Sequence, residues 1–185
     1  MDILFEIYKD SRTVFRISDI ALLLNINDVC LRKKLNYLVG QDKLLNIRRG
    51  IYAKAGYNPQ ELACRLCTPA YISFEKVLLS SGIIFQYSET ITCASYLSRE
   101  IEIDNQAIKY RKLKGEILVN PQGVILNQNN INIATPERAF LDMLYLNKNY
   151  YFDYTNSLNK SKLYEIVKIY DSPALLNKLK KYFPK

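Results

Sequence analysis

The sequence predicts an α+β protein with an N-terminal winged helix-turn-helix followed by a mixed α/β C-terminal domain. Apolar residues recur at helical spacing through the first 40 residues. Two short strand-like runs around an Arg-Arg-Gly turn come next, and further strand-like runs alternate with helical segments in the remainder. The turn-rich run Gly56-Tyr57-Asn58-Pro59 is the best boundary, which divides the chain into domains 1–56 and 57–185.

The N-terminal region reads as three helices and one short strand. Residues 2–9 suit a first helix, and the β-branched run at residues 11–15 suits a strand that could pair with a later hairpin. Ser18 is expected to cap a second helix, and Asn27 a third one that Gly40 ends. The expected buried positions of the three helices are Leu4, Ile7, Tyr8, Ile17, Ile20, Ala21, Leu24, Leu31, Leu35 and Leu38.

The third helix, from about Asp28 to Val39, is amphipathic. Its outer face carries Cys30, Lys33, Asn36 and Tyr37, with Arg32 on the flank. A short helix, a three-residue turn and a helix with a basic outer face are typical of a helix-turn-helix. The second helix of such a pair lies in the major groove of DNA with its N-terminal end deepest.

A basic hairpin is expected directly after this helix. Residues 44–47 and 51–53 form two strand-like runs joined by Arg48, Arg49 and Gly50, and glycine permits the positive φ of a tight turn. Arginines at such a tip can reach phosphates or an adjacent minor groove. The alternative interpretation of the two arginines is a solvated turn.

Positive charge is concentrated in two blocks of this chain, whose net charge is +8. Residues 27–54 hold seven basic and two acidic groups, and residues 159–185 hold seven lysines and two acidic groups. A polyanion is the natural partner of such blocks. The first block favours nucleic acid, whereas the second is better explained by lysines that solubilise exposed faces.

Several absences argue against an enzyme or a cofactor. The chain has no histidine, no GxxxxGK[ST] loop and no GxGxxG. Cys64 and Cys67 form one CxxC, but a structural zinc site needs four ligands, so buried thiols are expected and no metal or other cofactor. Glu137 and Asp142 lie five apart on one helix, about 140° around its axis, and therefore do not converge. No catalytic residue is predicted, and a nuclease-like activity on these carboxylates is the weakest alternative.

The C-terminal domain reads as a mixed sheet flanked by helices. Pro59 is expected to start a helix through Cys67, Ser73 to cap a helix that reaches Ser81, and Thr135-Pro136 to open another helix. Two amphipathic helices follow in the tail, before and after Pro173. The expected strands are residues 90–95, 100–103, 107–113, 116–119, 123–126 and 132–134.

Neither a signal peptide nor a membrane span is expected. The first ten residues already carry acidic groups, and no apolar run approaches the roughly 20 residues that cross a bilayer. A cytoplasmic protein without a membrane partner is therefore predicted.

Three segments resemble AbiEi-type antitoxins of bacterial abortive-infection (type IV toxin–antitoxin) systems. The run LNYLVGQDKLLNIRRGIYA resembles the winged-helix module of that family, including its basic-Gly-hydrophobic-Tyr signature. TPAYISFEKVLLSSGI resembles the family's Pro-x-Tyr-Ile-Ser helix start, and INIATPERAFLDML its strand-to-helix segment with a Leu-Asp pair. These segments occur in the family's order, although many members are longer than this chain.

The resemblance implies a transcriptional repressor that acts as an antitoxin and binds inverted repeats in its own promoter. The paired toxin would be of the nucleotidyltransferase type, and the antitoxin need not contact it directly. From the residues, Lys33, Asn36 and Tyr37 are predicted for the groove, Asn27 and Arg32 for its edge, and Lys43, Arg48 and Arg49 for phosphates. The alternative is a winged-helix module that binds protein or RNA and has no promoter-regulating role.

Overall fold

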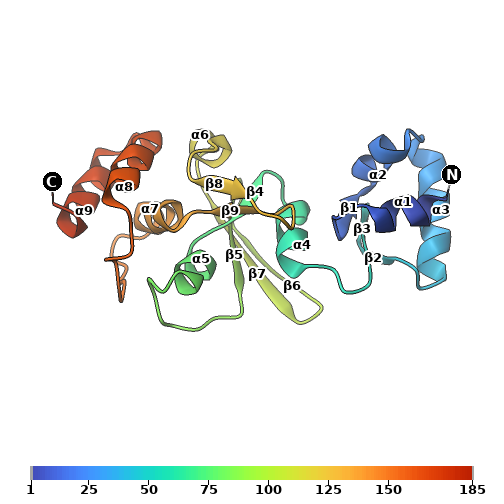
Figure 1. Cartoon of the computed structure of the whole chain (residues 1–185), viewed down its shortest axis with the longest axis horizontal. Helices are drawn as coiled ribbons and strands as arrows, with labels where there is room; N and C mark the ends of the chain where they lie inside the picture. Colours follow the sequence, from blue (N-terminus) through green and yellow to red (C-terminus); the bar gives the residue numbers. More distant parts are fainter. Residues whose placement is uncertain (1, 185) are drawn as a thin grey trace.

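The computed structural model describes residues 2–184, apart from the side chain of Asp28. The chain is an elongated α+β protein, as predicted (Figure 1). A small unit of helices and strands lies at one end, a six-stranded sheet lies in the middle, and the last helices lie at the opposite end.

The N-terminal unit packs three helices against a three-stranded antiparallel sheet of order β1-β3-β2. As the sequence predicts, the early strand β1 pairs with the second hairpin strand, β3. Phe15, Leu31 and Leu35 are fully buried in the core of this unit. The elements are α1 (Ile3–Lys9), β1 (Val14–Arg16), α2 (Ile17–Leu24), α3 (Asp28–Gly40), β2 (Leu45–Arg48) and β3 (Ile51–Ala53).

Local capping explains where these helices start. The Asn27 side chain accepts a hydrogen bond from the Val29 amide at 2.9 Å, so the prediction that Asn27 caps α3 is confirmed. The prediction that Ser18 caps α2 is wrong. This helix begins at Ile17, because the Arg16 backbone N–H donates to the Asp19 carboxylate at 3.1 Å and Asp19 thereby closes the first turn.

Three further details of this unit differ from the prediction. In α1 the buried residues are Ile7, as predicted, and Ile3, whereas Tyr8, which was expected to be buried, is about half exposed. Gly40 lies inside α3, and the chain takes its left-handed turn at Asp42, with φ of 55°. The first hairpin strand begins at Leu45 and includes Arg48.

The C-terminal unit is built on a mixed sheet of order β6-β7-β5-β4-β9-β8. The pairs β4/β9 and β5/β7 are parallel, and the other three are antiparallel. The strands are β4 (Ala70–Ile72), β5 (Ile91–Ser95), β6 (Arg99–Ile103), β7 (Gln106–Lys112), β8 (Val124–Leu126) and β9 (Asn132–Ala134).

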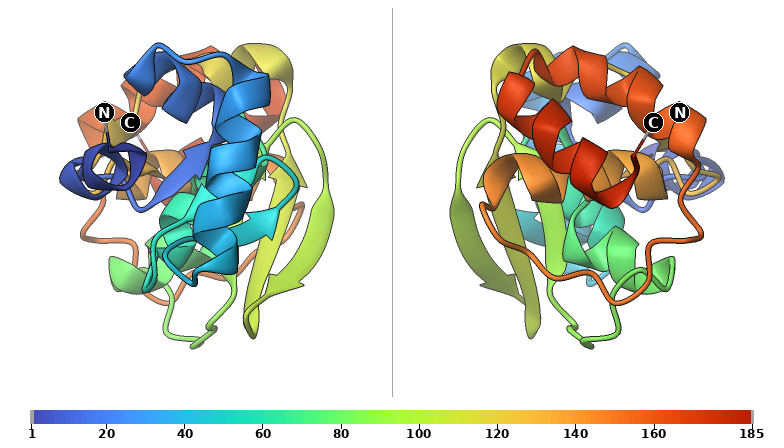
Figure 2. Two further views of the ribbon diagram at one scale, coloured as in Figure 1. Left: turned by 90° about the vertical axis from the view of Figure 1, so that its right-hand side faces the viewer. Right: turned by 90° about the vertical axis from the view of Figure 1, so that its left-hand side faces the viewer.

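Helices cover this sheet on both sides. Figure 1 shows α4 on the side facing the N-terminal unit, and α5 and α7 on the other side, with α8 and α9 beyond them. The two views of Figure 2 place α8 and α9 at the end opposite α1–α3. The helices are α4 (Pro59–Leu66), α5 (Glu75–Ser80), α6 (Gly115–Val119), α7 (Pro136–Leu146), α8 (Lys160–Ile166), the 3-10 helix η1 (Val167–Tyr170) and α9 (Pro173–Tyr182).

Two elements of this unit differ from the sequence prediction. The run at residues 116–119, expected as a strand, is the short helix α6, in which Ile117 and Leu118 are both buried. The Ile117 carbonyl accepts a hydrogen bond from the Arg138 guanidinium at 2.7 Å instead of one from a neighbouring strand. Residues 70–72, expected to lead directly into a helix, form the central strand β4.

The prediction that Ser73 caps α5 is wrong, because the Ser73 side chain belongs to a buried polar cluster. The Asp142 carboxylate accepts hydrogen bonds from Ser73 at 2.7 Å, Tyr71 at 3.0 Å and Tyr170 at 2.6 Å. The Arg138 guanidinium lies 3.3 Å from the same carboxylate, and both charged side chains are fully buried. Burial raises the pKa of Asp142, and Arg138 and the three hydroxyl donors oppose that rise.

Candidate nucleic-acid interface

The outer face of α3 presents the four side chains predicted for it, Cys30, Lys33, Asn36 and Tyr37, with Arg32 on the flank. All five are exposed, and Tyr37 has 65% of its surface open to solvent. Neither Arg32 nor Lys33 is in an ion pair with a carboxylate that the structure describes. Both positively charged side chains therefore lie on the surface of α3.

Two polar side chains of α3, Asn36 and Tyr37, make hydrogen bonds to other side chains of the N-terminal unit. Asn36 Oδ1 accepts a hydrogen bond at 3.4 Å from the hydroxyl of Tyr52, which is buried in β3. The Tyr37 hydroxyl accepts a hydrogen bond from Gln41 one turn later. The sheet therefore orients the Asn36 amide, whose Nδ2 group makes no hydrogen bond within residues 2–184.

Asn27 and Lys43 flank α3 and are exposed. The Oδ1 atom of Asn27 accepts the hydrogen bond of the helix cap, and its amide Nδ2 is the donor that it can offer to a ligand. The Lys43 carbonyl accepts a hydrogen bond from the Tyr8 hydroxyl at 3.0 Å, which ties the segment before β2 to α1 and leaves the ammonium group exposed.

The hairpin places its two exposed arginines differently. Arg48 ends β2 and pairs with Ile51, whereas Arg49 and Gly50 form the turn. Gly50 has φ of 77°, as its place in the sequence predicts, and its carbonyl accepts a hydrogen bond from the Ile17 amide at 2.9 Å. The hairpin tip is thereby fixed to the start of α2.

Burial raises the pKa of the Cys67 thiol, which follows α4. A hydrogen bond with Tyr110 and the positive charges of Arg99, Arg48 and Arg16 oppose that rise.

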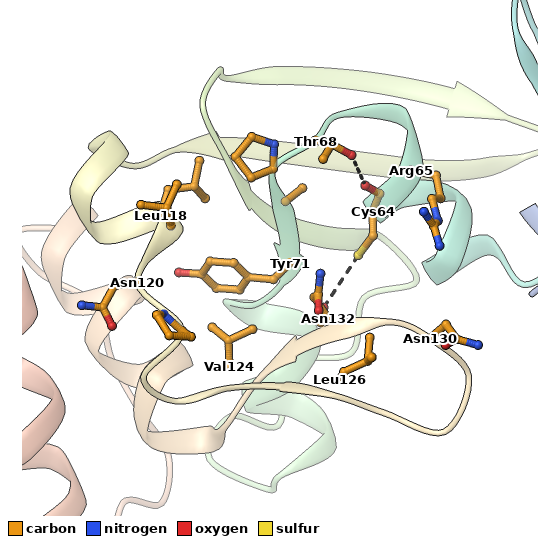
Figure 3. Close-up of a pocket in the computed structure, with 14 residues that line it drawn as sticks. Cys64, Arg65, Thr68, Tyr71, Leu118, Asn120, Val124, Leu126, Asn130 and Asn132 are labelled. Atoms are coloured by element: carbon orange, nitrogen blue, oxygen red, sulfur yellow. Dashed lines mark hydrogen bonds between the residues drawn. The ribbon is translucent and has the colours of Figure 1, made fainter. Parts of the chain in front are cut away.

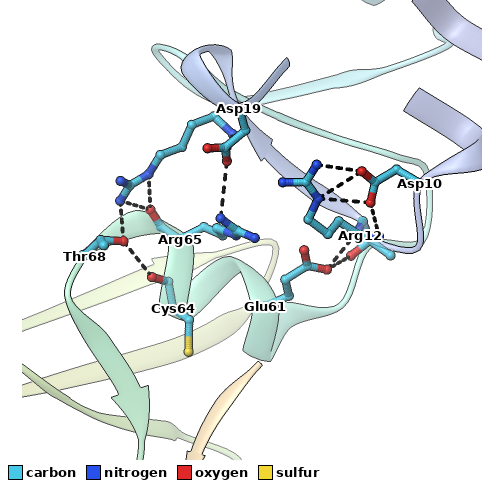
Figure 4. Close-up of polar contacts among 9 residues, drawn as sticks. Asp10, Arg12, Asp19, Glu61, Cys64, Arg65 and Thr68 are labelled. Atoms are coloured by element: carbon cyan, nitrogen blue, oxygen red, sulfur yellow. Dashed lines mark hydrogen bonds and ion pairs between the residues drawn. The ribbon is translucent and has the colours of Figure 1, made fainter. Parts of the chain in front are cut away.

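A polar joint connects the two units, and the sequence reading missed it (Figure 4). Arg16 donates two hydrogen bonds to the Arg65 carbonyl, at 3.0 and 2.6 Å, and one to the Thr68 hydroxyl at 2.6 Å. Arg65 in turn lies 3.3 Å from the Asp19 carboxylate. These partners are 46 to 52 residues apart in the chain, so no local pattern could have identified them.

A buried carboxylate completes the joint. Glu61 on α4 is 1% exposed, and its Oε2 atom accepts hydrogen bonds from the backbone N–H and the hydroxyl of Thr13, at 2.8 and 2.6 Å. Beside it, Arg12 pairs with Asp10 at 2.6 Å. The joint therefore attaches α4 directly to the strand edge of the N-terminal unit.

A cavity of about 580 Å³ lies beside this joint, between the end of α4, α6 and the β8–β9 hairpin (Figure 3). Its polar side chains include Asn120, Asn130 and Asn132, amides that cannot serve as general acids or bases at neutral pH. Among the described residues no three histidine, cysteine or acidic side chains gather as metal ligands.

The cysteine pair and the two carboxylates are accounted for by packing. Cys64 and Cys67 are buried, as predicted, and burial raises the pKa of Cys64 to about 12. Asp142 belongs to the buried cluster, whereas Glu137 accepts a hydrogen bond from the Asn159 amide at 3.2 Å. The two carboxylates therefore have separate partners, as the helical spacing predicts.

Within residues 2–184, no helix combines the length and apolar character needed to cross a membrane. Comparison of the chain with protein-family models gave no match, and no curated protein matches it either.

Proposed function

We propose that this protein is a DNA-binding transcriptional repressor whose helices α2 and α3 and β2–β3 hairpin act as a winged helix-turn-helix. The observation that carries the proposal is a set of six exposed basic side chains without a carboxylate partner in the described chain. Such groups keep their full charge for phosphates and release counterions when DNA binds. They are Arg32, Lys33, Lys34, Lys43, Arg48 and Arg49.

The outer face of α3 would read base edges. Lys33 can donate to guanine, and an asparagine such as Asn36 can pair with adenine in the major groove. The contact from Tyr52 restricts the Asn36 amide before DNA arrives, so less conformational freedom is lost on binding. Lys43, Arg48 and Arg49 would contact phosphates, and Asn27 and Arg32 would lie at the edge of the groove.

The antitoxin role rests on the resemblance of three segments to AbiEi-type antitoxins. In this chain those segments fall on α3 to β3, on β4 to α5, and on β9 to α7. We infer from the resemblance that the protein represses its own promoter at inverted repeats and antagonises a nucleotidyltransferase-type toxin. Two copies on such repeats would match the symmetry of the operator.

A salt titration tests the DNA-binding proposal. Operator and random DNA are titrated with the wild-type protein and with Arg48→Ala/Arg49→Ala at several salt concentrations. Losing two phosphate contacts should flatten the slope of log affinity against log salt by roughly 1.8, with sequence preference largely kept. The matched control is Lys112→Ala/Lys114→Ala, which removes two exposed charges from the C-terminal unit. A slope equal to that of the control would contradict a phosphate role for the hairpin.

A second variant separates base reading from charge. Lys33→Ala/Tyr37→Ala should lower the preference for operator over random DNA, because base contacts carry discrimination. Co-expression with the adjacent toxin gene tests the antitoxin role separately: growth should be rescued by the full chain. Absence of rescue would remove the antitoxin role and leave the repressor proposal standing.

A specific observation supports a second candidate, a module that binds protein. Leu22 is 83% exposed and Val29 67% exposed on α2 and α3. An open groove of about 360 Å³ also lies between α1 and α3, with Ile3, Leu4 and Leu38 among its lining. If Leu22→Ser abolished the rescue of growth while the affinity for DNA stayed unchanged, the protein-binding candidate would be favoured.

A further inference from the structure

A second candidate site lies at the end of the molecule opposite the N-terminal unit. A groove of about 400 Å³ runs between the loop after α7 and the helix α9. We call it the C-terminal groove. Figure 2 shows that this end of the molecule faces away from α1–α3. Its lining includes Lys148, Tyr150, Tyr151, Lys178, Lys181 and Tyr182.

Two tyrosines of the C-terminal groove, Tyr182 and Tyr151, differ in their contacts and in their exposure. The ring of Tyr182 stands edge-on to Phe140 and Phe152, with centroids 5.6 and 5.7 Å away, and its hydroxyl donates to the Tyr150 carbonyl at 3.1 Å. This ring is therefore fixed, yet 40% of Tyr182 is exposed. Tyr151 is 80% exposed, so its ring is open to a ligand. Together they offer aromatic surface of the kind on which unpaired bases stack.

The charged side chains among the described residues that line the C-terminal groove are all lysines. They are Lys148, Lys178 and Lys181. Lys178 is fixed, because its ammonium donates to the Leu144 and Asn147 carbonyls at 2.8 and 2.7 Å. Burial and the nearby charge of Lys148 lower the pKa of Lys178. Lys148 and Lys181 are exposed, and neither has an ion-pair partner in the described part of the chain.

We propose that the C-terminal groove binds single-stranded nucleic acid, with bases on Tyr151 and Tyr182 and phosphates on Lys148 and Lys181. A duplex keeps its bases stacked on one another, so it offers no free base face on which the rings of Tyr151 and Tyr182 could stack. An unpaired strand offers bases and phosphates together. The site is independent of the proposed repressor function, because it lies on different elements at the other end of the protein.

The experiment measures fluorescence anisotropy of labelled oligothymidine and oligouridine of about 15 nucleotides. Every protein in the series carries Lys33→Ala, Arg48→Ala and Arg49→Ala, so that the N-terminal interface does not contribute. The test variants are Tyr151→Ala, Tyr151→Phe and Lys148→Ala/Lys181→Ala. The matched controls are Tyr87→Ala, a tyrosine 75% exposed outside the groove, and Lys112→Ala/Lys114→Ala.

Stacking and charge should separate in the results. Tyr151→Ala should weaken binding roughly fivefold or more with an unchanged salt slope, and Tyr151→Phe should retain binding. The double lysine variant should flatten the salt slope by roughly 1.4. Tighter binding of either oligonucleotide supports the site and identifies the strand as DNA or RNA. The proposal would be overturned if an abasic strand bound as tightly as a strand with bases, because the groove would then act only as a charged surface. It would also be overturned if Tyr87→Ala weakened binding as much as Tyr151→Ala.

Discussion

Glu61→Ala tests the joint that holds the N-terminal unit to the rest of the chain. Glu61 is almost fully buried, and one of its oxygens accepts two hydrogen bonds from Thr13. The Thr13 hydroxyl also accepts a hydrogen bond from the Asn58 amide at 2.9 Å, at the start of α4. Removing the carboxylate therefore leaves the Thr13 amide without its acceptor and loosens β1 from α4.

The expected magnitude follows from two opposing effects. Two hydrogen bonds to a charged acceptor contribute about 1.5–3 kcal/mol each. The second oxygen, Oε1, is buried without a hydrogen-bond partner in the described part of the chain, and its removal returns about 1–3 kcal/mol. At the midpoints of these ranges, the free energy of unfolding should fall by about 2–3 kcal/mol in Glu61→Ala.

Urea unfolding of the full chain, followed by circular dichroism, measures this loss. Glu102→Ala is the matched control, because Glu102 is exposed on β6. Adding Thr13→Val completes a double-mutant cycle, in which the coupling energy should be about 1–2 kcal/mol. A loss below about 1 kcal/mol, or a coupling energy near zero, would show that the joint does not depend on this carboxylate.

Other predictions test the C-terminal fold, the thiols and the pH response. Gly123→Ala should cost about 3–5 kcal/mol, because a Cβ would lie 2.9 Å from the Arg138 Cβ at φ of +75°. Gly56→Ala, at φ +69° in open space, should cost only about 1 kcal/mol in the same urea unfolding assay, and equal losses in the two variants would contradict the clash. In a native thiol titration only Cys30 should react quickly, because the other three thiols are buried; a faster second thiol would refute that assignment. The Arg12 hydrogen bonds lower the pKa of Asp10 below its ordinary 3.8, so the pair stabilises the fold above that pH and loses its effect as the carboxylate protonates. Asp10→Asn should therefore lower stability at neutral pH and reduce the loss on acidification, and parallel stability curves for the two proteins would argue against the ion pair.

The tertiary arrangement also gives the joint a functional consequence. Arg16 precedes α2 and donates to carbonyl and hydroxyl groups at the end of α4. The hairpin tip is attached to the same start of α2 through Gly50. The candidate DNA interface is therefore fixed to the C-terminal unit through α2, and its orientation is set by contacts that neither unit makes alone.

The sequence by itself determined those features that depend on neighbours a few residues apart. Helical spacing of apolar residues predicted the buried positions Leu31 and Leu35, and the capping preference of asparagine predicted the start of α3 at Asn27. The need for positive φ at Gly50 likewise predicted the hairpin turn. The exposure of Lys33, Asn36 and Tyr37 followed from the helical periodicity of α3.

Only the tertiary structure decided the features whose partners are distant in the chain. Residues 116–119 are apolar enough for a strand or a helix, and the contact of Arg138 with the Ile117 carbonyl accompanies the helix. Ser73 has a suitable side chain for a helix cap, but in the fold its hydroxyl donates to Asp142, which is 69 residues away in the chain. The joint through Glu61 and the C-terminal groove also combine residues from separate segments. Local patterns cannot specify such contacts, because burial and hydrogen bonding between distant segments depend on how the whole chain packs.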